Sequence, residues 1–147
     1  MDDWTRMYVG DEIAQAGYQG SVVLGEAVSG AASVVVCEAT RRGATALFAF
    51  GFEQLDDGER MPSGAIRAPY RRGRHAARAE QPVGPWLAFG GWSDLDPGFR
   101  VIVGKVRDPE ATTCRVISSA QTKTLPVRDG LVIGWIEARR DVRFEVV

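Results

Sequence analysis

Alternating apolar and polar residues make up most of the chain beyond residue 20. Phe48, Phe50 and Phe52 alternate with small residues, and this period of two predicts a strand with one buried face. Other short runs are rich in β-branched and aromatic residues and are separated by turn residues, which also predicts strands. The predicted strands are 21–26, 32–40, 44–54, 85–92, 99–106, 112–120, 123–127, 131–138 and the final run 142–147.

Two turns close predicted hairpins. The residues Arg41, Arg42 and Gly43 separate the second and third strands, and Asp129-Gly130 separates the runs 123–127 and 131–138. Aspartate and glycine tolerate the positive φ angles of a type I′ turn, so Asp129-Gly130 is the strongest hairpin signal in the chain.

The first residues follow a helical pattern instead. Asp2 or Asp3 can act as the N-cap, and Gly17 supplies a left-handed stop, so we expect a short helix over about 3–16. Gly10 lies in its middle and costs about 1 kcal/mol relative to alanine. Such a helix must gain its stability by packing against the strands.

Together these elements predict one all-β domain over 1–147, a β-sandwich of immunoglobulin-like or related type. It has eight or nine strands and a short N-terminal helix. A hydrophobic content of 45% and a charged content of 25% fit an ordinary globular domain. The segment 56–85 has no period and contains several prolines and glycines, so we expect one long loop there.

This predicted loop is rich in arginine. The stretch 65–79 holds five arginines and no acidic residue in a chain whose net charge is -1. Arginine forks bind phosphate or carboxylate, and a tyrosine beside them offers a stacking face for a nucleic-acid base. The candidate binding residues are therefore Arg67, Tyr70, Arg71, Arg72, Arg74, His75 and Arg78. The alternative is a solvated loop, or one that folds back onto the acidic remainder of the chain.

Candidate catalytic and metal-binding groups are few. His75 is the only histidine, and a long loop does not give it the rigid support that catalysis requires. Cys37 and Cys114 have no short ligand spacing, so no zinc site is expected. Free thiols are favoured over a disulfide between them. We expect no catalytic residue, metal or cofactor.

Two acidic clusters give a further hypothesis. Asp56, Asp57 and Glu59 surround one glycine, and Asp94 and Asp96 precede another. Neither cluster has the spaced ligands of a calcium loop, and aspartate beside glycine or proline is typical of a tight turn. A hydrolase that uses carboxylates such as Asp94 and Asp96 is the least favoured function.

Residues 99–138 resemble a pattern found in uncharacterised bacterial envelope and secreted proteins. The matching features are a strand that ends near Gly104, an Asp108-Pro109 turn, an alternating strand over 114–117, and the Asp129-Gly130 hairpin before Trp135. The resemblance implies a small β-domain behind a leader or lipid anchor, and it implies no known activity.

Three functions follow. The favoured one is a non-catalytic interaction or accessory domain with a protein partner, and the second is anion or nucleic-acid binding through the 67–78 loop. The hydrolase is third.

No apolar run approaches the roughly 20 residues that span a bilayer. A homodimer through an open sheet edge is a further possibility. The opening MDDWTRMYVGDE contains no leader, which favours the cytoplasm, or an extracytoplasmic location if a leader has been removed.

Overall fold

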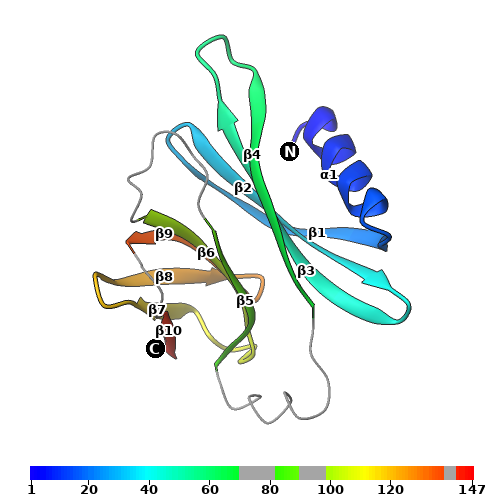
Figure 1. The fold of residues 1–147 in the computed structure, drawn as a ribbon. Coiled ribbons are helices and arrows are strands. Elements are labelled where there is room, and N and C mark those ends of the chain that lie inside the picture. The colour runs from blue at the N-terminus through cyan, green and yellow to red at the C-terminus, as the bar shows by residue number, and fades with distance from the viewer. Residues whose placement is uncertain (70–81, 90–98, 138–141) are drawn as a thin grey trace.

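The computed structural model describes residues 1–69, 82–89, 99–137 and 142–147. In these residues it contains one helix and ten strands, one strand more than the largest number expected (Figure 1). The elements are α1 (Asp3–Gln15), β1 (Gln19–Ser29), β2 (Ala32–Arg41), β3 (Ala44–Gln54), β4 (Arg60–Pro69), β5 (Val83–Phe89), β6 (Phe99–Val106), β7 (Thr113–Ile117), β8 (Thr122–Arg128), β9 (Leu131–Glu137) and β10 (Arg143–Val146).

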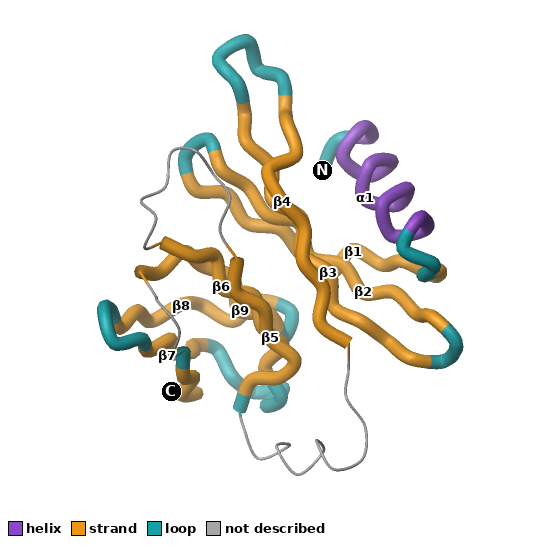
Figure 2. The backbone as a smooth tube through the Cα atoms, viewed as in Figure 1, coloured by secondary structure: helices purple, strands orange, loops and turns teal. Residues whose placement is uncertain are grey.

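The strands form two antiparallel sheets. One has four strands in the order β1-β2-β3-β4, and the other has six in the order β10-β7-β8-β9-β6-β5. The six-stranded sheet is curled into a half-barrel, and α1 lies on the opposite side of the four-stranded sheet (Figure 2). The predicted all-β fold with an N-terminal helix is therefore confirmed.

The prediction of one loop over 56–85 is wrong, because β4 occupies Arg60–Pro69. Pro62, Gly64 and Pro69 interrupt the alternation on which strand prediction depends. The structure tolerates them because β4 pairs with a strand on one side only, namely β3. An edge strand can hold proline, since half of its backbone amides need no partner in the sheet. Residues 70–81 of the predicted loop lie outside the described residues.

The ends of α1 agree with the sequence signals. Asp2 is the N-cap, and its carboxylate accepts a 2.7 Å hydrogen bond from the backbone amide of Thr5. This hydrogen bond is the main cause that lowers the pKa of Asp2 below its usual value. Gly17 adopts a φ of 84° just beyond the helix, as expected for a left-handed stop.

Two hairpins use the turn chemistry that their sequences predict. Arg42 and Gly43 between β2 and β3 have φ angles of 50° and 75°, and Asp129 and Gly130 between β8 and β9 have 52° and 74°. Two successive positive φ angles are the signature of a type I′ turn, whose twist matches that of the flanking strands.

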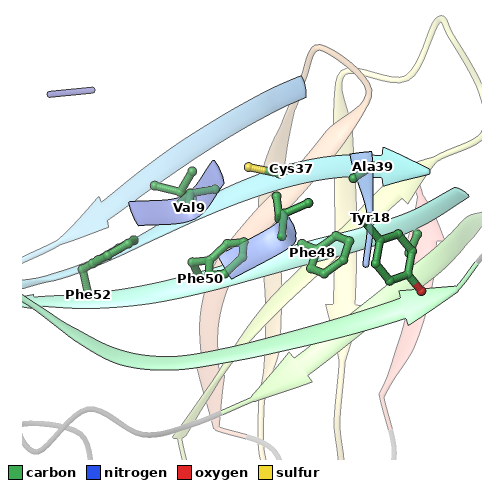
Figure 3. Packing of buried hydrophobic residues seen from close by; sticks show 10 residues of the cluster. Val9, Tyr18, Cys37, Ala39, Phe48, Phe50 and Phe52 are labelled. Carbon is green, nitrogen blue, oxygen red and sulfur yellow. The ribbon is translucent and has the colours of Figure 1, made fainter. Parts of the chain in front are cut away.

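Three apolar clusters hold these layers together. The outer core lies between α1 and the four-stranded sheet and consists of Val9, Ile13, Tyr18, Val35, Cys37, Ala39, Ala46, Phe48, Phe50 and Phe52 (Figure 3). The inner core lies between the two sheets and consists of Ala32, Val34, Val36, Leu47, Ala49, Leu87, Val101, Val103 and Leu131. The predicted burial of the three phenylalanines is confirmed.

The third cluster, the barrel core, fills the concave side of the curled sheet. It consists of Val83, Ile102, Val106, Cys114, Val116, Leu125, Val132 and Ile136. A Cβ atom at Gly104 would collide with Val83, and one at Gly134 would collide with Leu125. These two glycines therefore provide the space for the curl, which brings the rings of Trp86 in β5 and Phe144 in β10 to 5.5 Å.

Hydrogen bonds of Ser118 and Gln121 join the turn between β7 and β8 to β9. The hydroxyl of Ser118 donates a 2.6 Å hydrogen bond to the carbonyl of Glu137 at the end of β9. The same hydroxyl accepts hydrogen bonds from the amides of Ala120 and Gln121, and the Gln121 side chain accepts one from the Glu137 amide. The turn between β7 and β8 is thereby attached to β9.

Replacing Gly134 by alanine is expected to lower the free energy of unfolding by about 1–3 kcal/mol, because the added methyl group overpacks the barrel core. Gly10→Ala is the control, since it adds the same methyl group to α1 where nothing lies within 4 Å. It should instead stabilise the protein by up to about 1 kcal/mol. Urea denaturation measures both changes, and unaltered stability of Gly134→Ala would contradict the role assigned to this glycine.

Candidate anion-binding site around Tyr18

Tyr18 lies where the chain passes from α1 into β1. Its amide donates a 3.1 Å hydrogen bond to the carbonyl of Ile13, which closes the helix around Gly17. Its ring meets the ring of Phe48 in β3 edge to face, with the centroids 5.0 Å apart and an interplanar angle of 84°. Tyr18 is thus held at one end of the outer core, beside Phe48 (Figure 3).

Two arginines from different strands stack on this ring. The guanidinium carbon of Arg41, at the end of β2, lies 4.8 Å from the Tyr18 centroid, and that of Arg67, in β4, lies 5.4 Å from it. The two guanidinium groups are therefore separated by no more than the sum of these distances. The sheet register places Arg67 opposite Phe48, and Arg41 opposite Ala44, which lies four residues before Phe48 on the same face of β3.

Both guanidinium groups are exposed, and within the described part of the chain neither forms an ion pair. Arg41 makes one long hydrogen bond, of 3.5 Å, to the carbonyl of Ala16. The last turn of α1 holds no basic residue, so Arg41 supplies the positive charge that a helix C-terminus favours. A guanidinium that stacks on a ring keeps its N–H groups in its own plane, where they can donate to an oxyanion.

Arg60, at the start of β4, has a different environment. Its guanidinium donates a 2.9 Å hydrogen bond to the hydroxyl of Thr5 and lies 3.6 Å from the carboxylate of Asp2. It also stacks over Phe52 at 5.6 Å. Arg60 therefore fastens the beginning of α1 to the sheet, whereas Arg41 and Arg67 keep donors available to a ligand.

The structure places only one of the sequence-predicted binding residues in this site, namely Arg67. Tyr70, Arg71, Arg72, Arg74, His75 and Arg78 lie outside the described residues. Sequence reasoning missed Tyr18 and Arg41. Arg41 falls in a predicted hairpin turn, and a search for aromatic residues just beyond the ends of predicted helices could have indicated Tyr18.

Neither cysteine is suited to nucleophilic chemistry. Cys37 lies in the outer core and Cys114 in the barrel core, and both are free and fully buried, which agrees with the prediction of free thiols. Burial raises the pKa of Cys37 to about 12 and raises the pKa of Cys114 as well. Both groups are protonated near pH 7, and a protonated thiol is a poor nucleophile.

The acidic cluster at 56–59 forms a turn between β3 and β4. The Asp57 carboxylate accepts a 2.9 Å hydrogen bond from the amide of Glu59, and Gly58 has a φ of 86°. Among the residues that the structure describes, no group of three histidines, cysteines or acids is arranged to hold a metal ion. Asp94 and Asp96, the residues of the hydrolase hypothesis, lie outside the described residues.

Comparisons with protein-family models, with curated proteins and with solved structures find no match for this chain. The resemblance over residues 99–138 therefore stays a prediction. In the described ranges, no helix is long and apolar enough to cross a membrane.

The raised pKa of Cys37 predicts a loss of stability in alkaline solution. A thiol whose pKa is higher in the folded state contributes fully below its unfolded pKa of 9.0, and the contribution disappears as pH rises toward 12. The difference in unfolding free energy between the native protein and Cys37→Ala should therefore shrink above about pH 9. Urea denaturation under reducing conditions measures it. A difference that stays constant to about pH 10 would contradict burial of this thiol.

Proposed function

We propose that this protein is a non-catalytic binding domain that takes an anionic partner at Arg41 and Arg67. The observation that carries the proposal is the stacking of two exposed guanidinium groups on one buried tyrosine ring. Within the described residues these groups have no acidic partner, so their charge is available to a ligand.

The Tyr18 ring supports binding by restricting the two side chains. A free arginine loses much rotamer freedom when it grips an anion, and a side chain already stacked on a ring loses less. The sequence adds charge beyond Arg67, since Arg71, Arg72 and Arg74 follow β4. The net charge of the chain is only -1, so the whole protein does not attract anions. The attraction comes from the local arginines and should weaken as the salt concentration rises.

The same site suits an accessory domain that binds a macromolecule. Phosphate or carboxylate groups on that macromolecule can each accept two hydrogen bonds from one arginine. The inner core between the two sheets supports the proposal that the fold is a sandwich related to immunoglobulin-like domains. Such folds serve many unrelated functions, so the site and not the fold carries the functional argument.

The double variant Arg41→Gln/Arg67→Gln is expected to weaken binding to fluorescent heparin fragments by at least about tenfold, because two charge-assisted contacts are lost. The slope of log affinity against log salt should fall by about 2. The matched control is Arg128→Gln/Arg143→Gln, which removes the same charge from exposed positions on β8 and β10.

Fluorescence anisotropy across a salt series measures these affinities. Equal losses in the two double variants would mean that only net charge matters and would contradict a site at Tyr18. Absence of binding by the native protein at low salt would overturn the proposed function.

A further inference from the structure

The proposed site continues into a row of aromatic rings beneath α1. Phe48 touches Tyr18 and lies nearly parallel to Phe50, at an interplanar angle of 6° with the centroids 6.1 Å apart. Phe52 extends the row along β3, and Val9 of α1 lies beside it (Figure 3). All three phenylalanines are buried by α1 and the four-stranded sheet.

Arginines stand at both ends of this row. Arg41 and Arg67 stack on Tyr18 at one end, and Arg60 stacks on Phe52 at the other. A sheet face that combines aromatic rings with cationic side chains is the arrangement that binds single-stranded nucleic acid, since every base can stack and every phosphate carries charge. Here the rings are covered, and two arginines already stack on Tyr18.

The cover, α1, is held mainly by nonpolar packing. Its fully buried residues are Thr5, Val9 and Ile13, and the rings of Trp4 and Tyr8 pack against Phe52. Polar contacts attach only its two ends: Arg60 and a 3.8 Å ion pair between the Met1 amino group and Glu26 at the beginning, and the hydrogen bond from Arg41 to the carbonyl of Ala16 at the end. Partly exposed ion pairs such as these contribute little and are screened by salt.

The packing of the two sheets against each other does not involve α1. The inner core and the barrel core contain no residue of the helix, so both sheets can stay packed when it moves. Gly17 provides a natural pivot, since its φ of 84° lies in the region that glycine adopts freely. Tyr18, the next residue, is anchored by Phe48 and the two arginines, so a movement of α1 would end there.

We propose that α1 is a displaceable cover, and that single-stranded nucleic acid binds the uncovered face with its bases on Phe48, Phe50 and Phe52 and its phosphates on Arg41 and Arg67. This inference rests on the proposed function and adds the class of ligand. Arg60 becomes a further phosphate contact once α1 leaves it. When α1 covers the rings, the protein binds polyanions through the charges of Arg41 and Arg67 alone.

The apparent affinity for a single strand is then the intrinsic affinity multiplied by the fraction of molecules in which α1 is displaced. Changes that stabilise α1 must weaken nucleic-acid binding, and changes that destabilise it must strengthen binding. Heparin, which has charge but no bases, needs only Arg41 and Arg67, so its affinity should not follow the stability of the helix.

Three variants change α1 without replacing a binding residue. Gly10→Ala raises helix propensity and should weaken binding to fluorescent oligo(dT) about fivefold. Asp2→Ala removes the N-cap and should strengthen it about fivefold. Asp2→Asn is the matched control, because it removes the same charge but keeps a good capping residue, and it should bind like the native protein.

The two cysteines report on the cover without any ligand. Cys37 lies in the outer core and Cys114 in the barrel core, so displacement of α1 exposes the first thiol but not the second. When the folded protein is treated with a small thiol reagent, Cys37 should react about fivefold faster in Asp2→Ala and about fivefold slower in Gly10→Ala. Cys114 should react at one common, slower rate in all variants.

The outcomes separate this inference from the proposed function. Equal oligo(dT) affinities in all variants, with heparin binding still lost in Arg41→Gln/Arg67→Gln, would overturn the displaceable cover and leave the anion site intact. Equal reaction rates of Cys37 and Cys114 would overturn it as well, since the helix would then open only with the whole fold. Loss of both oligo(dT) and heparin binding in the native protein would overturn both proposals.

Discussion

The burial of β2 and β3 on both faces is the constraint on which the rest of the structure depends. Along β2, Val34 and Val36 point into the inner core while Val35 and Cys37 point into the outer core. Water on either face of such strands costs hydrophobic free energy, so each face needs an apolar cover. One face is covered by the curled sheet and the other by α1, which explains why a helix with a central glycine is retained against the sheet.

The same constraint produces the arginine pair at the edge of the outer core. The helix ends at Gly17, and Tyr18 fills the remaining apolar surface beside Phe48. The stems and planar groups of Arg41 and Arg67 then cover a ring that would otherwise be exposed, while their charged edges stay in solvent. A packing requirement and a binding capability are thus met by the same side chains.

Features that depend on neighbouring residues were predicted from the sequence, whereas features that depend on residues far apart in the chain were not. The cap at Asp2, the stop at Gly17 and the Asp129-Gly130 turn each depend on neighbours within a few residues, and all are present. Strand β4 was missed because its prolines are acceptable only at an edge, which is a property of the whole sheet. Arg67 was selected for its charge, but its neighbours Arg41 and Tyr18 come from other elements of the chain and meet it only in the folded protein. The attachment of Ser118 to β9 likewise has no sequence signature.

The distribution of the three clusters along the chain has a consequence for biosynthesis. The outer core is complete at Phe52, whereas the barrel core begins only at Val83. Because synthesis proceeds from the N-terminus, α1 can meet β2 and β3 before any strand of the second sheet exists. The apolar inner face of those strands stays exposed until β5, β6 and β9 have been synthesised. At that stage α1 covers the outer face of the first sheet, whereas the inner face is still exposed and can associate with other apolar surfaces.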